Sequence, residues 1–147
     1  MDKKVLYKDR WITIEEETAR VRGKKVTVGR YIQRDVAVVI PIFDDGKLLL
    51  ERQYRHAMRR YLYEFPAGTF EDGESPLTAA RREMCEETGY TARSIKPLLQ
   101  YYPDALSTRR FYLFYAQGLR KESTRLKLDN TEIIKIVKLK QIGRASV

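Results

Sequence analysis

The sequence is poor in cysteine, glycine and proline, and it has no long run of apolar residues. Cys85 is the only cysteine among 147 residues, so no disulfide can form within one chain, and a secreted disulfide-rich scaffold is excluded. Gly and Pro number 8 and 5, too few for a collagen-like or low-complexity chain. No stretch of about 18 apolar residues is present, and the N-terminus lacks the apolar centre of a signal peptide. These absences predict a folded protein of the cytoplasm.

The residues that are present have the balance of an ordinary folded domain. Hydrophobic residues make up 43% of the chain and charged residues 33%, which argues against disorder. A chain of 147 residues has the commonest domain size and leaves little room for a second core. We therefore expect a single domain over residues 1–147.

The net charge of +9 is unevenly distributed. Residues 1–35 hold ten Lys/Arg and six Asp/Glu, residues 119–147 hold eight and three, and residues 36–118 hold eleven of each. From Glu64 to Glu87, seven acidic residues stand against two basic ones. Because like charges repel unless solvated or neutralised, this acidic segment is either a solvated helix face or a cation site. The basic flanks indicate a field that favours an anionic ligand, and do not by themselves indicate DNA or RNA.

The first part of the chain alternates apolar and polar residues as β strands do. Residues 11–17 and 24–32 show this alternation, and the turn at 22–24 between them predicts a hairpin. Residues 35–43 are rich in Val and Ile, which predicts a strand buried on both faces. A short turn then leads into another strand at residues 48–54.

The clearest helix signal lies between Ser75 and Gly89. Ser75 can cap the helix, Pro76 suits its first position, and Gly89 supplies the C-terminal stop. An apolar stripe at spacings of three and four is formed by Leu77, Ala80, Met84 and Thr88. This stripe predicts that the helix packs on a sheet.

Three further β-like runs follow the helix, at residues 92–102, 109–119 and 131–140. Strands on both sides of a central helix predict an α/β layered domain with a mixed sheet.

The same helix carries Glu83, Glu86 and Glu87, whose spacing crowds three carboxylates onto one side of two turns. A solvated face would ordinarily supply Lys partners four residues away, and none is present. Hard oxygen ligands suit Mg²⁺ or Mn²⁺, which keep several waters and often bind substrate phosphates. Gly68 and Gly73 in the preceding loop allow the backbone to approach a ligand closely. The pattern predicts a divalent-metal site for a phosphate compound.

Residues 68–90, GTFEDGESPLTAARREMCEETGY, resemble the signature of the Nudix hydrolases. Its seven fixed positions are all matched, by Gly68, Glu74, Arg82, Glu83, Glu86, Glu87 and Gly89. With each fixed residue expected at about one position in fifteen, a chance match has a probability on the order of 10⁻⁸ per starting position. Tyr90 occupies the last position, which is usually apolar.

The resemblance implies an α/β/α sandwich with a mixed sheet, and Mg²⁺-dependent hydrolysis of a nucleoside diphosphate linked to another moiety. It further implies that Glu83, Glu86, Glu87 and the backbone carbonyl of Ala67 bind the metal. Glu86 is then a further ligand or the base that activates water, Arg82 orients the carboxylates, Glu74 supports them, and Gly68 contacts the substrate. Chemically, a divalent ion neutralises the diphosphate oxygens and lowers the pKa of bound water.

The run ERQYRHAMRRYLYEFPAG and the β-rich residues 1–35 resemble the ADP-ribose pyrophosphatases, which release AMP and ribose 5-phosphate. In that group, extra N-terminal strands help to form a homodimer, so residues 1–35 are expected to be a dimerisation element. By the same resemblance, Arg55 contacts the diphosphate and Glu64 lies near the substrate or the metal.

The loop that follows the signature departs from the family pattern, so other functions remain as alternatives. YYPDALSTRR has Thr108 and Arg109 where acids are expected, which leaves Asp104 as the candidate acid of the loop on the substrate side. The alternatives are a Nudix hydrolase for a nucleotide sugar, a dinucleoside polyphosphate, NADH or an oxidised nucleotide, and a non-catalytic module that binds nucleotides or nucleic acid. Nucleic acid is disfavoured because no helix clusters Lys and Arg on one face.

The other ring side chains are interpreted as structural. His56, the single histidine, is expected to be packed or exposed, since the proposed chemistry needs no imidazole. Four tyrosines near the loop are expected mainly in the sheet or a dimer interface, although one could stack on a base: Tyr101, Tyr102, Tyr112 and Tyr115.

Overall fold

The structure is a computed structural model that describes residues 3–123, 126–128 and 133–140. Three N-terminal strands form an antiparallel sheet in the order β1-β2-β3: β1 (Lys3–Lys8), β2 (Thr13–Val21) and β3 (Lys24–Ile32). The predicted hairpin is β2–β3. At its turn Arg22 and Gly23 have φ of 50° and 79°, the positive values that a tight two-residue hairpin turn requires. β1 had no counterpart among the predicted strands.

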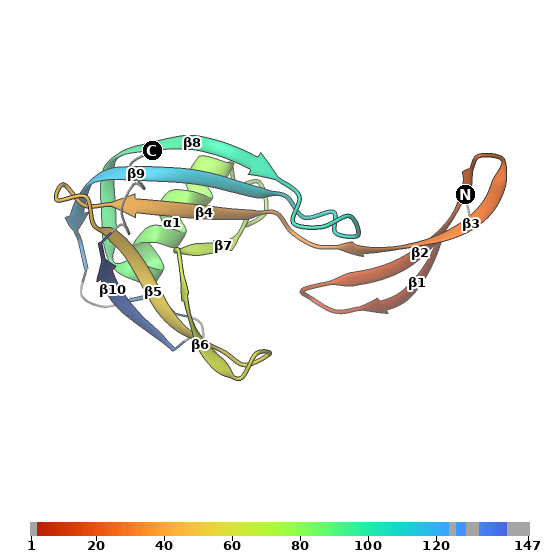
Figure 1. Cartoon of the computed structure of the whole chain (residues 1–147), viewed down its shortest axis with the longest axis horizontal. Coiled ribbons are helices and arrows are strands. Elements are labelled where there is room, and N and C mark those ends of the chain that lie inside the picture. The colour runs from red at the N-terminus through yellow and green to blue at the C-terminus, as the bar shows by residue number, and fades with distance from the viewer. Residues whose placement is uncertain (1–2, 124–125, 129–132, 141–147) are drawn as a thin grey trace, which may run out of the picture.

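The second sheet has seven strands and contains the parallel and antiparallel pairs of the predicted mixed sheet. The strands are β4 (Val36–Ile42), β5 (Leu48–Arg55), β6 (Arg60–Glu64), β7 (Ala67–Thr69), β8 (Tyr90–Tyr101), β9 (Phe111–Lys121) and β10 (Ile134–Leu139). Their order is β10-β5-β4-β9-β8, with β6 paired to β5 and β7 paired to β4 (Figure 1). β4 and β9 are parallel, and the other pairs are antiparallel. The class expected from the sequence, α/β with a mixed sheet, is confirmed.

β4 is the strand that was predicted to be buried, and none of its residues is exposed. It pairs with β5 only at Ile42 and Leu48, beside the turn that joins them. Further along, β7 takes the place of β5, and the amide of Val39 donates to the carbonyl of Pro66 at 2.9 Å. β5 and β6 therefore diverge from β4, as Figure 1 shows, and this divergence opens the sheet beside the helix.

The helix α1 (Pro76–Thr88) forms where the sequence predicts it. The Ser75 side chain accepts from the amide of Thr78, and Gly89, with φ of 71°, ends the helix. Ala80, Met84 and Thr88 of the expected stripe are buried. Leu77 is 39% exposed, contrary to the prediction, and Ala79 is buried instead, because the sheet contacts the helix on the side of Ala79 and Ala80.

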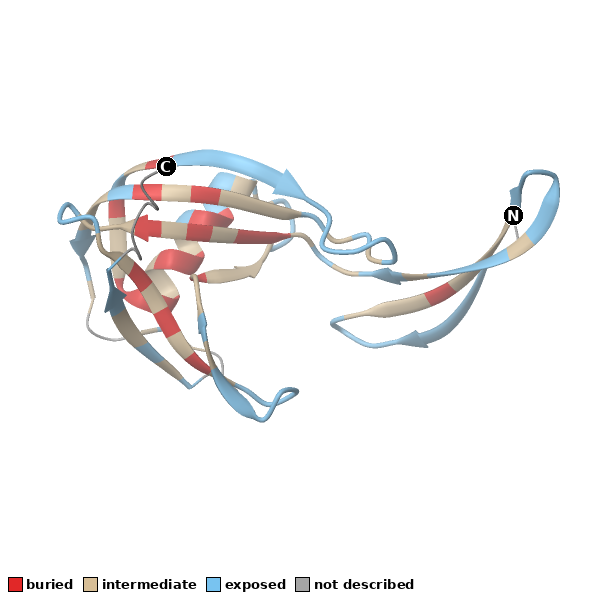
Figure 2. Ribbon diagram, viewed as in Figure 1, coloured by how far each residue is buried: buried red, intermediate tan, exposed pale blue. Residues whose placement is uncertain are grey.

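The core lies between α1 and the strands β4, β8 and β9 (Figure 2). It consists of Ala37, Val39, Ala79, Ala80, Met84, Ala92, Ile95, Phe114 and Ala116. Within the described ranges α1 is the only helix, so one of the two helical layers of the expected α/β/α sandwich is seen there. In that part of the chain no helix is long and apolar enough to cross a membrane.

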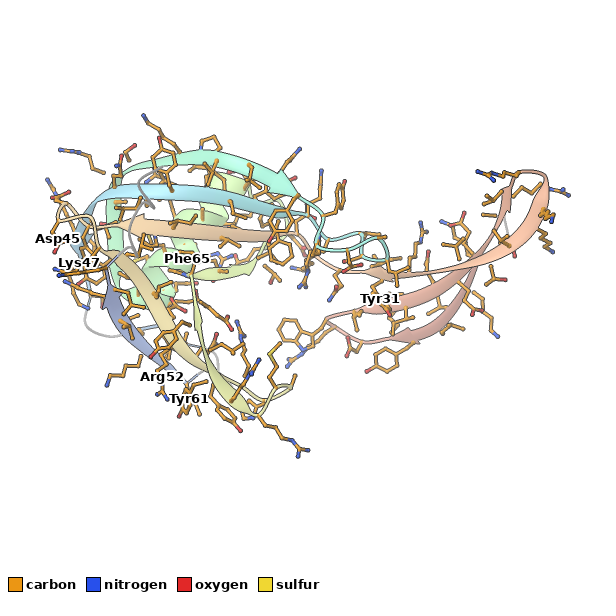
Figure 3. All side chains as sticks on the ribbon, viewed as in Figure 1. Tyr31, Asp45, Lys47, Arg52, Tyr61 and Phe65 are labelled. Carbon is orange, nitrogen blue, oxygen red and sulfur yellow. The ribbon has the colours of Figure 1, made fainter. Side chains whose placement is uncertain are left out.

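The N-terminal sheet joins the rest of the fold through the loop between β8 and β9. The amide of Tyr31 donates to the carbonyl of Leu106, and the amide of Thr108 donates to the carbonyl of Tyr31, both at 2.8 Å. Figure 3 shows Tyr31 at this junction. The N-terminal sheet extends away from the seven-stranded sheet, which leaves β1 and most of β3 exposed, whereas most of β2 is half-buried between them (Figure 2).

The helix terminus yields a stability prediction. A Cβ at residue 89 would lie 2.2 Å from the backbone oxygen of Ser123, whereas a Cβ at Gly46, which has a similar φ of 77°, would meet nothing within 4 Å. We expect Gly46→Ala to lower the free energy of unfolding by about 1 kcal/mol, the cost of the left-handed backbone alone. Gly89→Ala should cost roughly twice that or more, because backbone atoms must also move. Urea unfolding of both variants measures the difference, and equal losses would contradict the close contact.

Candidate active site

The acidic side chains of α1 are largely withdrawn from solvent. Glu83 and Glu87 are 9% and 6% exposed, and both are classed with the buried residues. A solvated helix face would leave such carboxylates in water, so that interpretation is excluded for these two residues. Buried carboxylates must be paired, hydrogen-bonded or bound to a cation.

Arg82 is the hub of the acidic cluster. Its Nε and Nη2 donate to the two carboxylate oxygens of Glu74 at 3.0 and 2.9 Å, a bidentate pair. Nη1 donates to Glu83 Oε1 at 2.8 Å and to Glu86 Oε2 at 3.2 Å. Nη2 also donates to the carbonyl of Thr69 at 3.0 Å. One guanidinium thus connects β7, the loop before α1 and two turns of the helix.

These contacts shift the pKa values of both partners. The hydrogen bonds that Arg82 donates to Glu74 lower the pKa of Glu74, and the same hydrogen bonds raise the pKa of Arg82. Glu74 therefore stays ionised well into the acidic range, and Arg82 keeps its charge throughout. The pair is a fixed electrostatic frame beside Glu83 and Glu86.

Short contacts between β7 and α1 fix the other two carboxylates. The amide of Ala67 donates to Glu87 Oε2 at 2.8 Å. A Cβ at residue 68 would lie 2.0 Å from Glu83 Oε1, so only glycine at position 68 lets the Glu83 carboxylate lie against the strand. The strand and the helix are thus in contact through Ala67 and three residues that the signature fixes, Gly68, Glu83 and Glu87.

Two hollows meet at these carboxylates. The larger, of about 1020 Å³, lies where β5 diverges from β4, and Ala67, Gly68 and Arg55 are on its wall. The smaller, of about 230 Å³, is lined by Arg82, Glu86 and residues of the preceding loop. Glu83, Glu87, Thr69 and Trp11 border both hollows. A volume of this size suits a small-molecule ligand.

The structure brings most of the predicted site residues together. Arg55 lies on the wall of the larger hollow and forms an ion pair with Glu64, with Nε donating to its two oxygens at 2.9 and 3.1 Å. Glu64 is thus connected to the site through Arg55. Asp104 borders neither hollow, and its Oδ1 accepts from the amides of Leu106 and Ser107 at 2.7 and 2.8 Å. Its carboxylate shapes its own loop.

Several residues that line the hollows were not predicted. Trp11, Gln33, Gln53 and Tyr54 border the larger hollow. His56 is there too, exposed and with its ring 5.1 Å from that of Tyr54, which agrees with the expectation of a packed or exposed histidine. Tyr112 packs on Phe70 at 5.3 Å, and Tyr101 stacks on Phe111 at 5.4 Å, so both behave structurally, as expected.

The oxygen donors of α1 have the chemistry that a hard divalent cation requires. Glu83 and Glu86 are oriented towards Arg82, and Glu87 is oriented towards the amide of Ala67. In this arrangement no three acidic, His or Cys side chains of the described ranges converge as metal ligands. Glu86, which is 29% exposed, already lines the smaller hollow, and rotation of its side chain away from Arg82 would make it a third carboxylate that can face a cation beside Glu83 and Glu87. The chemical type of these donors, carboxylate oxygens, suits Mg²⁺.

With this geometry established, the family follows. Residues 33–146 match the NUDIX domain, so the chain belongs to the Nudix family. The match includes the strands β4 to β10, the helix α1 and all seven fixed residues of the signature.

The chain is similar to two ADP-ribose pyrophosphatases and to one solved structure over most of its length. The chain is 27% identical over 139 residues to ADP-ribose pyrophosphatase from Bacillus subtilis (strain 168), covering 93% of this chain and 75% of that protein. It is 31% identical over 111 residues to ADP-ribose pyrophosphatase from Mycobacterium tuberculosis (strain ATCC 25618 / H37Rv), covering 74% and 54%. A crystal structure of ADP compounds hydrolase superposes with a TM-score of 0.83 at 26% identity, covering 95% of this chain and 76% of that one.

The pairing of Glu74 with Arg82 predicts a pH dependence of stability. Because the pKa of Glu74 is lowered from 4.5 in the folded chain, the pair stabilises the fold above that value, and the contribution is lost as the pH falls through the folded pKa. Glu74→Gln should lower the free energy of unfolding by about 1–3 kcal/mol at pH 7. The difference from the unmodified chain should shrink below about pH 4.5, measured by urea unfolding. A difference that stays constant down to pH 3 would contradict this pairing.

Proposed function

We propose that the protein hydrolyses ADP-ribose to AMP and ribose 5-phosphate with Mg²⁺ as cofactor. The observation that carries this proposal is the acidic cluster of α1, organised by Arg82 at the junction of two hollows. Relatives named ADP-ribose pyrophosphatase, which cover most of this chain, support the choice of substrate. Mn²⁺ is the alternative metal, since it takes the same oxygen ligands.

The two sides of the larger hollow bind different groups in this proposal. Arg55, held by Glu64, offers its guanidinium to the diphosphate from the β5 side. Glu83, Glu86, Glu87 and the carbonyl of Ala67 would hold Mg²⁺ on the α1 side. The bound metal supplies charge neutralisation and a more acidic water.

In this proposal, a carboxylate of α1 removes the proton of the attacking water. A water oxygen forms a bond to one phosphorus as the bridging P–O bond breaks, and the other phosphate leaves with the bridging oxygen. Glu86 accepts the water proton, because it is the more exposed of the two carboxylates on Arg82 Nη1. Asp104 is a weaker candidate for the base, since two amides of its own loop already occupy its oxygen.

Other nucleotide substrates are the main competitors. Nucleotide sugars and NADH carry the same diphosphate and differ in the group beyond it, and dinucleoside polyphosphates carry a longer phosphate chain. A panel of these compounds with Mg²⁺ and a coupled phosphatase ranks them by kcat/KM, and ADP-ribose should rank first. If another diphosphate has a higher kcat/KM, that compound replaces ADP-ribose as the proposed substrate, and the proposed hydrolysis of a diphosphate still holds. No turnover of any compound would favour a module that binds nucleotides without catalysis.

Removal of one carboxylate charge tests the metal assignment. Glu83→Gln and Glu87→Gln should each lower kcat by about 100-fold or more, because the metal loses an anionic ligand while the side-chain volume is kept. Asp44→Asn, in an exposed turn, is the matched control and should retain full activity. Activity is measured with ADP-ribose and Mg²⁺, and circular dichroism checks the fold. Chelation by EDTA should abolish turnover, and undiminished activity in either Gln variant would refute the assignment.

We further propose that the chain is one Nudix hydrolase domain that works as a homodimer in the cytoplasm, with residues 1–35 as the dimerisation element. Large apolar side chains are exposed along the N-terminal sheet, among them Val5, Leu6, Tyr7, Val21 and Val28 at 42–56%. Unpaired apolar surface of this kind favours association with a second copy. The single Cys85 agrees with a reducing compartment.

The dimer proposal has a direct test. At micromolar concentration the protein should sediment at twice the 17.3 kDa of one chain. Val5 and Val28 pair with Glu15 and Glu17 of β2 and share one face, so Val5→Asp with Val28→Asp should shift the species to monomer. Thr27→Asp, on the opposite face, is the control. Sedimentation of the unmodified chain as a monomer would contradict the proposal.

A further inference from the structure

A segment after β9 is fixed against the C-terminal end of α1. The amides of Glu122 and Ser123 donate to the carbonyl of Gly89 at 2.9 and 3.1 Å. The amide of Lys127 donates to the carbonyl of Glu86 at 2.9 Å. The backbone at Lys127 is therefore positioned by the same turn of helix that carries Glu86 and Glu87.

Lys127 lines the smaller hollow together with Glu83, Glu86 and Glu87. Two other cationic side chains of the described residues line it, and both are engaged. Arg82 is surrounded by carboxylates, and Arg34 pairs with Asp72 at 3.0 Å and donates to the carbonyl of Phe70 at 3.2 Å. Lys127 forms no ion pair with a residue in the ranges that the structure describes.

We propose that Lys127 is a phosphate-binding residue, whose ammonium group contacts a non-bridging oxygen of the phosphoryl group that lies against Glu83, Glu86 and Glu87. This inference rests on the proposed function and adds a residue to its substrate site. An ammonium offers three donors and no acceptor, so it complements phosphate oxygen and is not consumed by the reaction. Arg55 contacts the diphosphate from the larger hollow, and Lys127 contacts it from the smaller hollow, on the other side of the carboxylates.

The position of Lys127 suits this role for a physical reason. Carboxylates alone repel an incoming diphosphate, and the charge of Arg82 is already shared among Glu74, Glu83 and Glu86. A cation at the rim of the smaller hollow lowers the electrostatic barrier to entry of the anion. A purely structural role is the competing explanation, since a cation near a helix C-terminus also stabilises the helix dipole.

Substitution of the side chain separates the two explanations, because Lys127→Ala keeps the amide that donates to Glu86. We expect Lys127→Ala to raise KM for ADP-ribose about tenfold or more with a smaller change in kcat, and Lys127→Arg to restore KM to within about threefold. Lys96→Ala removes an exposed lysine of β8 that borders neither hollow, and its KM should be unchanged. A structural role would lower the melting temperature and leave KM unchanged.

Binding of inorganic pyrophosphate with Mg²⁺, measured by titration calorimetry, distinguishes failure of this inference from failure of the proposed function. If pyrophosphate binds more weakly to Lys127→Ala and the unmodified chain does not turn over ADP-ribose, the phosphate-binding role of Lys127 is supported and ADP-ribose is refuted as the substrate. Turnover and pyrophosphate binding that are both unaffected by Lys127→Ala would overturn the role of Lys127 and leave the proposed function standing. If the unmodified chain neither turns over ADP-ribose nor binds pyrophosphate, both are overturned.

Discussion

The guanidinium of Arg82 is the contact on which the rest of the site depends. Its five N–H donors reach Glu74 in the loop before α1, Glu83 and Glu86 in α1, and the carbonyl of Thr69 in β7. A lysine ammonium has three donors and no planar fork, so it could not make the bidentate pair with Glu74 and the other contacts together. Without this cation, the carboxylates of α1 would repel one another.

The surrounding fold keeps these partners in register. Divergence of β5 from β4 makes room for the larger hollow, and β7 brings Gly68 against Glu83. The connection between β3 and β4 holds the loop before α1, since the amide of Phe70 donates to the carbonyl of Asp35 at 3.1 Å. Along the sequence, the basic excess flanks the acidic segment, a distribution that favours an anionic ligand at long range and a cation at the acidic cluster itself.

Local patterns were enough to predict α1, its caps and its acidic cluster, because helix spacing and capping depend on neighbours within a few residues. The hairpin β2–β3 was predictable for the same reason. The short strand β7 was not, since it exists through pairing with β4, which lies far back in the chain. β6 forms a hairpin with the neighbouring β5, but the turn at residues 56–59, HAMR, contains none of the Gly, Pro, Asn or Asp residues that mark a turn in a sequence. Trp11 and Lys127 reach the site from opposite ends of the chain, and no local spacing indicates such long-range placement. Leu77 fits the helical period, but the sheet does not cover it.

The central claim is that Arg82 organises the carboxylates into a working site. The most direct measurement is kcat/KM for ADP-ribose with Mg²⁺ in Arg82→Lys, which keeps the charge and loses the fork. With the fold intact by circular dichroism, kcat/KM should fall by about 100-fold or more, as expected when catalytic side chains lose their orientation. A value within about threefold of the unmodified chain would contradict the claim.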